Sequence, residues 1–216
     1  MDVRLCRIVG AGDFAPELID KSVPAYYIAA DGGLLSLRKA GIEPDIIAGD
    51  FDSLGFVPQG DNVLRFPREK DDTDVGLAVK HGLKSGFTVF ELYGVTGGRL
   101  DHTLANLQIL SSLSLKGCAA LIKGTTVTAT AVTNGTVGFY GSPGDTVSVF
   151  AFNGEARGVT LTGFKYPLTG AALRGDYPIG VSNKLTGTHG TVTVASGTVT
   201  VTANTVKGKF IQESSI

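Results

Sequence analysis

Two patterns of apolar and polar positions divide the chain near residue 118. In residues 1–118, short apolar runs that suit buried strands alternate with segments whose apolar residues recur at helical spacing. The expected strands are 3–9, 25–30, 45–48, 62–66 and 88–93, and the expected helices are 33–40, 72–84 and 99–113. A strand and helix in regular alternation predict an α/β domain built on a wound, mostly parallel sheet.

The pattern changes in residues 119–216. This part holds 18 of the 22 threonines, and Thr favours strands because its side chain is branched at Cβ. Four glycine turns punctuate it: Asn134-Gly135, Pro143-Gly144, Asn153-Gly154 and Ser196-Gly197. Such spacing predicts hairpins in an all-β sandwich or barrel. We therefore expect two domains, residues 1–118 and residues 119–216.

Charge and cysteine content exclude several classes of protein. The chain has 216 residues and a formal net charge of -1, so a broad basic surface for nucleic acid is not expected. We find no signal peptide pattern and no apolar run of about 18 residues that could span a membrane. Cys6 and Cys118 are isolated within apolar runs, which predicts buried free thiols and a reducing, cytoplasmic location.

Carboxylates follow the predicted strands of the first domain. Asp31 ends one strand, Asp50 and Asp52 follow the next, and a third group stands at the start of a predicted helix. That third group is Asp71, Asp72 and Asp74, and Asp101 follows the strand 88–93. The carboxyl ends of parallel strands share one edge, so the four groups should converge on one cleft. Crowded carboxylates need cations, and Mg²⁺ with substrate phosphates suits such oxygen ligands.

Each of these residues has an ordinary structural alternative. Asp72 or Asp74 could cap a helix, and Asp50 could form an Asx turn. Lys70 and Arg99 stand beside acidic residues, where they could hold phosphate oxygens or form surface ion pairs. His102 could hydrogen-bond or transfer a proton. The P-loop pattern is absent, and Gly10-Ala11-Gly12 lacks the third glycine of a dinucleotide-binding fingerprint.

Taken together, several motifs resemble those of the thiamine pyrophosphokinase family. In the first part they are Ala30-Asp31-Gly32-Gly33, Gly41-Ile42-Glu43-Pro44-Asp45, Gly49-Asp50-Phe51-Asp52-Ser53, Lys70-Asp71-Asp72-Thr73-Asp74, Thr96-Gly97-Gly98-Arg99-Leu100-Asp101-His102 and Leu104-Ala105-Asn106. In the second part they are residues 161–168 and Ser182-Asn183. Their order and spacing match over nearly the whole chain.

The resemblance implies an N-terminal α/β domain that binds ATP and Mg²⁺ and a C-terminal β-sandwich that helps to bind thiamine. It implies a homodimer with thiamine sites at the subunit interface. The implied reaction transfers the terminal pyrophosphoryl group of ATP to the hydroxyl of thiamine, giving thiamine diphosphate and AMP.

The resemblance also implies residue roles. The implied magnesium ligands are Asp50, Asp52 and Asp74, and the implied lining of the cleft is Asp31, Gly32 and Gly33. Phosphate oxygens would be held by Lys70, Thr73 and Arg99. Asp71 would support the metal or orient the hydroxyl, Asp101 and His102 would complete the site, and Ser182 and Asn183 would contact thiamine. The residues with implied catalytic roles are Lys70, Asp71, Arg99 and Asp101.

Two departures concern the thiamine pocket. Lys184 follows Ser-Asn where the family commonly has an acidic residue, and the chain has no Trp. Any aromatic stacking on thiamine must therefore come from Phe or Tyr. Two other functions share the acidic cleft: a metal-dependent phosphohydrolase, or a pyrophosphokinase for another alcohol. A regulator that binds nucleotide without turnover is the alternative that is not an enzyme.

Overall fold

The computed structural model describes residues 5–152, 154–204 and 208–213. The chain divides into two compact units, of which the first comprises residues 1–106 with 123–125. The second comprises residues 107–122 with 126–216, so helix α3 (Leu100–Leu115) contributes residues to both. The domain boundary that we expect between residues 118 and 119 stays a prediction.

The first unit holds five parallel strands of a larger sheet. Its strands are β1 (Leu5–Val9), β2 (Tyr26–Ala30), β3 (Ile46–Gly49), β4 (Val63–Arg65) and β5 (Val89–Tyr93). They lie in the order β5-β1-β2-β3-β4, and every neighbouring pair is parallel. The predicted α/β class is confirmed, with strand bounds within one or two residues of expectation. Residues 3 and 4 of the first expected strand lie outside the described residues.

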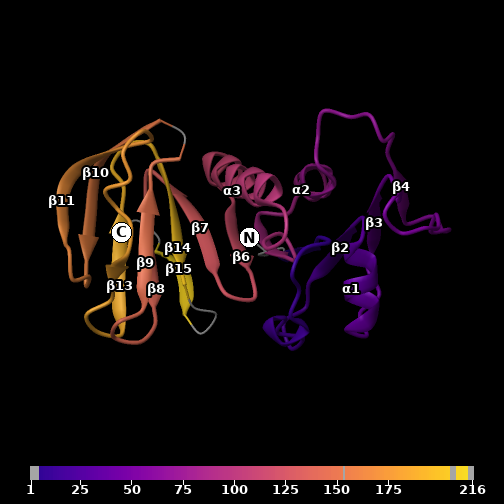
Figure 1. The fold of residues 1–216 in the computed structure, drawn as a ribbon, viewed down its shortest axis with the longest axis horizontal. Coiled ribbons are helices and arrows are strands. Elements are labelled where there is room, and N and C mark those ends of the chain that lie inside the picture. The colour runs from indigo at the N-terminus through magenta and orange to yellow at the C-terminus, as the bar shows by residue number, and fades with distance from the viewer. Residues whose placement is uncertain (1–4, 153, 205–207, 214–216) are drawn as a thin grey trace. The chain divides into compact units, whose positions relative to one another are not determined.

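Two helices cover opposite faces of this sheet (Figure 1). Val9 belongs to one apolar cluster with Leu34 and Leu37 of α1 (Gly33–Lys39). On α2 (Asp74–Lys84), a Cβ placed on Gly82 would lie 3.4 Å from Cys6 Sγ. Because side chains alternate along a strand, Cys6 and Val9 point to opposite faces. A short 3-10 helix, η1 (Pro16–Leu18), was not predicted.

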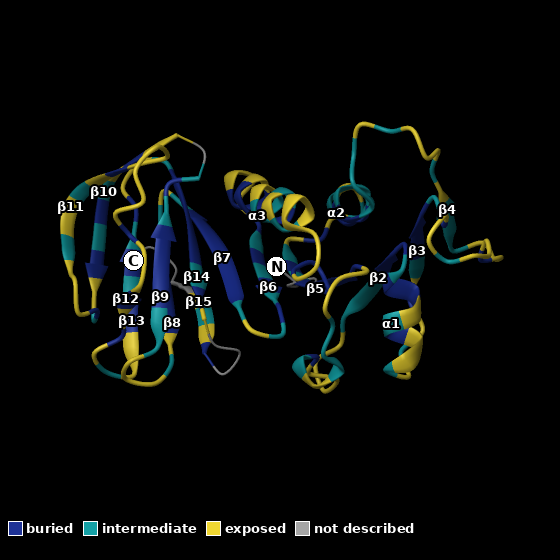
Figure 2. Cartoon of the chain, viewed as in Figure 1, coloured by how far each residue is buried: buried dark blue, intermediate teal, exposed yellow. Residues whose placement is uncertain are grey.

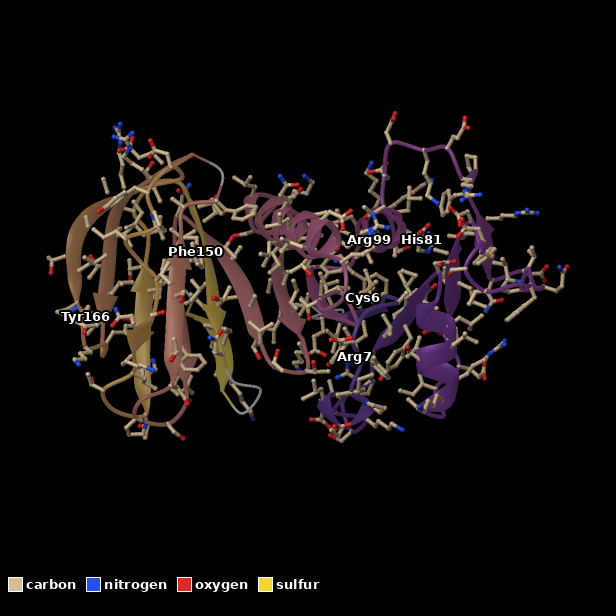
Figure 3. The ribbon with its side chains drawn as sticks, in the orientation of Figure 1. Cys6, Arg7, His81, Arg99, Phe150 and Tyr166 are labelled. Carbon is tan, nitrogen blue, oxygen red and sulfur yellow. The ribbon has the colours of Figure 1, made fainter. Side chains whose placement is uncertain are left out.

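A buried ionic cluster crosses β1, β2 and β5. Arg7, labelled in Figure 3, is 1 % exposed and donates from Nε to Glu91 at 2.7 Å. Lys123 binds the other oxygen of Glu91 at 2.6 Å, and the Tyr93 hydroxyl donates to Glu91 at 2.8 Å. Arg7 also donates to the Tyr27 hydroxyl at 2.8 Å. Such a cluster is tolerated inside a protein only because each charge has partners.

The second unit contains a β-sandwich, as predicted. One layer has the order β12-β9-β14-β7-β6 and the other β11-β10-β13-β8-β15. The first layer consists of β6 (Ala119–Lys123), β7 (Thr128–Thr133), β9 (Thr146–Phe150), β12 (Asn183–Lys184) and β14 (Thr198–Ala203). The second consists of β8 (Thr136–Tyr140), β10 (Glu155–Thr162), β11 (Leu168–Arg174), β13 (His189–Thr193) and β15 (Lys209–Glu213). Residues of both layers form one apolar core, with Val149 and Val201 from the first and Phe139 and Leu161 from the second.

Three of the four glycine turns do not form hairpins within one sheet, and for these three the expectation was wrong. Asn134-Gly135 leads from β7 in the first layer to β8 in the second, and Ser196-Gly197 leads from β13 back to β14. The two turns hold each other, because Gly197 N donates to Asn134 Oδ1 at 2.9 Å. Pro143-Gly144 also joins strands of different layers, and Asn153 lies outside the described residues. Short turns between antiparallel strands look alike in sequence whether they stay in one sheet or cross to another.

Hydrogen bonds between threonine and serine side chains link the elements of the second unit. Thr133 and Thr198 hydrogen-bond across β7 and β14 at 2.8 Å, and Ser114 of α3 reaches Thr133 at 2.9 Å. Strand β7 is almost wholly buried (Figure 2). None of the helices in the described ranges has the length and apolar character needed to cross a membrane.

Candidate active site

The loops at the carboxyl ends of the parallel strands approach one another very closely. A Cβ on Gly33 would lie 1.8 Å from the carbonyl oxygen of Val9, and a Cβ on Gly12 would lie 2.6 Å from that of Thr96. A Cβ on Gly32 would lie 2.9 Å from the Cβ of Ala11. These glycines are therefore needed for the loops after β1, β2 and β5 to meet. A nucleotide-binding role for Gly32 and Gly33 stays a prediction.

Lys70 binds two of the predicted carboxylates at this edge. Its Nζ donates to Asp50 Oδ2 at 2.9 Å and to Asp74 Oδ1 at 2.7 Å. Asp50 comes from the end of β3 and Asp74 from the first turn of α2. The structure thus brings together two residues that are 24 positions apart, with an ammonium group between them.

The electrostatics of the three groups are coupled. The hydrogen bond from Lys70 holds the pKa of Asp50 below its usual range. Burial raises the pKa of Asp74, although Lys70 acts in the opposite direction. Burial acts to lower the pKa of Lys70, but the hydrogen bonds to Asp74 and Asp50 outweigh it and raise that pKa. The site therefore keeps a positive charge in contact with two carboxyl groups near neutral pH.

Asp31 adds a third carboxylate near this pair. It is 9 % exposed, and its charge contributes to the raised pKa of Asp74. One of its oxygens accepts a hydrogen bond from the Ser53 hydroxyl. The other, Oδ1, is buried and has no hydrogen-bond partner in the part of the chain that the structure describes. A buried carboxylate oxygen without a donor is suited to a cation.

Asp52 has a different ion-pair partner from Asp50. Its carboxylate is 47 % exposed and pairs with Arg68 at 3.2 Å. Both residues line a cleft of ≈ 610 Å³ that also contains Phe56 and Phe66. Sequence reasoning missed Arg68, which stands only two residues before Lys70. It also missed Ser53, although its place directly after Asp52 in the Gly-Asp-Phe-Asp-Ser motif was a usable signal.

Three further predicted residues, Asp71, Asp72 and Thr73, directly precede α2. Thr73 is the N-cap, and its Oγ1 accepts a hydrogen bond from Gly76 N at 3.0 Å. The Thr73 hydroxyl can also donate a hydrogen bond to an acceptor such as phosphate. Asp71 is exposed, whereas Asp72 pairs with Lys80 at 2.6 Å.

Arg99, Asp101 and His102 form a separate exposed group at the start of α3. Arg99 binds Asp101 through two hydrogen bonds of 3.1 and 2.6 Å, and the backbone N of His102 donates to Asp101 at 3.0 Å. The hydrogen bonds from Arg99 hold the pKa of Asp101 below its usual range. These polar contacts of Arg99 and Asp101 stay within the group and do not reach Lys70.

In the second unit, Asn183 is 5 % exposed and its side chain holds the backbone of Tyr166. Tyr166 itself is 59 % exposed and projects from the turn between β10 and β11 (Figure 3). The backbone N of Ser182 donates to Ser148 Oγ at 3.0 Å. Sequence reasoning named Ser182 and Asn183 but missed the pairing with Tyr166, which is a tertiary contact between distant segments.

The donor set fits Mg²⁺ by its chemistry. Asp31, Asp50 and Asp74 offer carboxylate oxygens, and one oxygen of Asp31 is buried without a partner. Over the described ranges, no group of three or more His, Cys, Asp or Glu side chains is arranged to hold a metal ion. Mg²⁺ commonly binds only one or two carboxylates, together with water and substrate phosphates. The ammonium of Lys70 already occupies a cation position between two of them.

Comparison with known proteins assigns the family. The thiamin pyrophosphokinase catalytic domain matches residues 17–122, and the thiamin pyrophosphokinase vitamin B1 binding domain matches residues 136–199. Thiamine pyrophosphokinase of Bacillus subtilis is 32 % identical over 180 residues, which are 78 % of this chain and 82 % of the relative. The chain belongs to the thiamin pyrophosphokinase family.

Solved structures agree with this assignment. The crystal structure of thiamine pyrophosphokinase from Bacillus subtilis has a TM-score of 0.80 at 26 % identity, covering 94 % of this chain and 99 % of that one. That of thiamin pyrophosphokinase from Geobacillus thermodenitrificans has a TM-score of 0.78 at 27 % identity, covering 93 % and 97 %. As a member of the thiamin pyrophosphokinase family, the protein is an enzyme of the transferase class. The carboxylate cluster lies in the part that matches the catalytic domain, and Asn183 with Tyr166 in the part that matches the vitamin B1 binding domain.

Proposed function

We propose that the enzyme transfers the pyrophosphoryl group of ATP to the hydroxyl of thiamine, with Mg²⁺, giving thiamine diphosphate and AMP. The observation that carries the proposal is the pairing of Lys70 with Asp50 and Asp74 at the sheet edge, in a chain of this family. Residues 1–118 would form the catalytic domain, and residues 119–216 the domain that binds thiamine and dimerises.

Asp50 and Asp74 would hold Mg²⁺, with Asp52 as a further ligand once it leaves Arg68. When bound, Mg²⁺ neutralises negative charge on the phosphate oxygens. The chain adds positive charge through Lys70 and Arg99 and a hydroxyl donor through Thr73. Phosphoryl transfer depends mainly on such positioning and charge neutralisation, so these residues would orient the β-phosphorus for attack.

A carboxylate must accept the proton of the thiamine hydroxyl. Asp101 is a weak base because its hydrogen bonds from Arg99 favour the ionised form. Asp71 is exposed and follows Lys70 directly. We propose that Asp71 accepts the proton of the thiamine hydroxyl. Arg99 would then hold phosphate oxygens, and Asp101 and His102 would complete the site.

Tyr166 would provide the aromatic surface for thiamine in this chain without Trp. Its ring is exposed, and Asn183 fixes its backbone. A cationic ring stacks favourably on an aromatic face. Ser182 would contact thiamine directly, whereas the amide of Asn183 is already used on Tyr166.

The proposed homodimer would bury an apolar segment of the second unit. Tyr177, Ile179 and Val181 are 66 %, 58 % and 45 % exposed and lead directly to Ser182. Exposed apolar residues grouped in this way are typical of an interface. We place the enzyme in the cytoplasm, where Cys6 and Cys118 remain free thiols; both are buried, as predicted, and burial raises the pKa of Cys6 to about 12.

The test is to incubate the protein with ATP, Mg²⁺ and thiamine and to quantify AMP, ADP and thiamine diphosphate by chromatography. Equal amounts of AMP and thiamine diphosphate support the proposal. ADP or free phosphate formed without thiamine would indicate a hydrolase instead. ATP binding without turnover would indicate a regulator. Sedimentation at the assay concentration tests the dimer, and a fully active monomer would contradict a thiamine site at the interface.

A further inference from the structure

Lys70 contacts the same two carboxylates that the proposed function assigns to the metal. Its Nζ lies 2.9 Å from Asp50 Oδ2 and 2.7 Å from Asp74 Oδ1. The exposed fractions of the three side chains are 12 % for Lys70, 14 % for Asp50 and 27 % for Asp74. The ammonium therefore lies largely out of water, between the two oxygens that would bind an ion.

Two cations cannot use these oxygens at the same time. Mg²⁺ binds oxygen at about 2.0–2.1 Å, so an ion between the two carboxylates would lie against Nζ with like charge. Lys70 can move away, because its ammonium stands on a flexible four-carbon stem in the loop between β4 and α2. Asp50 directly follows a strand and Asp74 lies in the first turn of a helix, so regular structure beside them limits their movement.

A third carboxylate makes the region short of positive charge even with Lys70 in place. Asp31 is buried, and its Oδ1 has no hydrogen-bond partner among the described residues. Asp50 and Asp74 therefore share one ammonium, and the nearby charge of Asp31 adds to the negative potential at Asp74. This shortage favours a divalent ion over the single charge of Lys70 when the ion is present.

We propose that Lys70 is an internal counter-ion that competes with the divalent cation for Asp50 and Asp74 and transfers to the phosphate oxygens of the nucleotide when that cation binds. The inference rests on the proposed function, because it takes Asp50 and Asp74 as ligands. Binding of the ion displaces the Lys70 ammonium from the two carboxylates, and the phosphates of the nucleotide then provide the negative charge that it contacts. Ion and nucleotide therefore bind together more strongly than either binds alone.

The test measures binding of Mn²⁺, a spectroscopic substitute for Mg²⁺, to the nucleotide-free full chain by electron paramagnetic resonance. Lys70→Gln is compared with the wild type, and Lys80→Gln is the matched control because Lys80 pairs with Asp72 in the same segment. Lys70→Gln should bind Mn²⁺ about tenfold more tightly, the equivalent of about 1.4 kcal/mol for losing a charge-assisted competitor. Lys80→Gln should bind like the wild type.

A second titration uses Mn²⁺ with α,β-methylene-ATP, in which the bond to be broken is replaced. Here Lys70→Gln should bind the ion–nucleotide pair about tenfold more weakly than the wild type, because a charge-assisted contact to phosphate is lost. If Lys70 had a purely structural role, Lys70→Gln would bind more weakly in both titrations. Tighter binding of Mn²⁺ alone together with weaker binding of the ion–nucleotide pair therefore identifies the exchange. Lys70→Arg keeps a cation and should restore weak binding of Mn²⁺ alone, which guards against a folding defect in Lys70→Gln.

Failure of the exchange and failure of the metal site give different results. If the wild type binds Mn²⁺, Asp50→Asn abolishes that binding, and Lys70→Gln binds equally or less tightly, the exchange is wrong and the metal site stands. If Asp50→Asn leaves Mn²⁺ binding unchanged, the metal assignment in the proposed function fails, and the exchange fails with it.

Discussion

The side-chain amide of Asn183 holds the backbone of Tyr166 at both polar atoms. Its Oδ1 accepts from Tyr166 N at 2.9 Å, and its Nδ2 donates to Tyr166 O at 2.7 Å. Asn183 is buried and Tyr166 is exposed, so a buried polar side chain holds the backbone that carries a surface aromatic ring. The Ser-Asn motif would then act on thiamine through Tyr166 rather than through the amide itself.

This relationship predicts the effect of Asn183→Ala. The variant should raise the KM for thiamine about tenfold, a loss comparable to about 1.4 kcal/mol, while the KM for ATP stays within twofold. Tyr166→Ala should do the same, and Tyr166→Phe should retain the wild-type KM because the ring remains. Steady-state kinetics with each substrate varied separately checks this. A wild-type KM for thiamine in Asn183→Ala would contradict the role given to Tyr166.

Asp50→Asn should reduce kcat by about a hundredfold to a thousandfold, which corresponds to about 3–4 kcal/mol of lost charge stabilisation. The fold should remain, but the melting temperature should fall, since Lys70 favours the ionised form of Asp50 in the folded state. Asp72→Asn is the matched control, because Asp72 pairs with Lys80 on the same segment. Product formation at several Mg²⁺ concentrations, with a thermal melt of each variant, checks both effects. Near-normal rates of Asp50→Asn at limiting Mg²⁺ would show that Asp50 is not a metal ligand.

Glu91→Gln should destabilise the first unit by about 3 kcal/mol, because it leaves Arg7 buried with a weakened partner. Glu155, which pairs with Arg157 at an exposed position, is the matched control, and Glu155→Gln should cause no measurable change. Denaturant unfolding at neutral pH measures both. Equal stability of Glu91→Gln and the wild type would show that the buried cluster contributes no net stability.

The pKa of Glu91 predicts part of the dependence of stability on pH. Burial acts to raise the pKa of Glu91, but the hydrogen bonds from Lys123 and Arg7 outweigh it and hold that pKa below the usual value of 4.5. A folded-state pKa below the unfolded value means that the stabilisation is complete above about pH 4.5 and is lost as pH falls through the folded pKa. The free energy of unfolding, measured from pH 6 to about pH 3, should therefore decline less steeply in Glu91→Gln than in the wild type. An identical slope in both proteins would contradict this account.

The sequence was most informative where local spacing determines structure. The helix 72–84 and the strand 88–93 were predicted within two residues, because apolar periodicity reflects which side chains meet the sheet. The convergence of Asp31, Asp50 and Asp74 followed from the parallel order of strands, which places their ends at one edge.

Tertiary pairing was not accessible from spacing alone. The position of Lys70 between Asp50 and Asp74 depends on how a loop folds back over a strand end. The path of Asn134-Gly135 between the two layers depends on the packing of both layers, although its turn signal was clear. Asn183 and Tyr166 likewise meet only because β12 and the turn after β10 are neighbours in the folded unit.

The last prediction concerns the glycines that let the strand-end loops meet. In Gly33→Ala the new Cβ would lie 1.8 Å from the carbonyl oxygen of Val9, which is backbone and cannot rotate away. The start of α1 must then shift from β1, at a cost of about 3 kcal/mol. Gly187→Ala is the matched control, since nothing lies within 4 Å of its Cβ and its φ is ordinary. Denaturant unfolding should separate the two variants clearly, and a Gly33→Ala protein as stable as Gly187→Ala would show that the loop can yield at this point. Because Asp31 stands two residues before Gly33, the shift should also weaken Mn²⁺ binding in the folded fraction of Gly33→Ala, whereas Gly187→Ala should bind the ion normally.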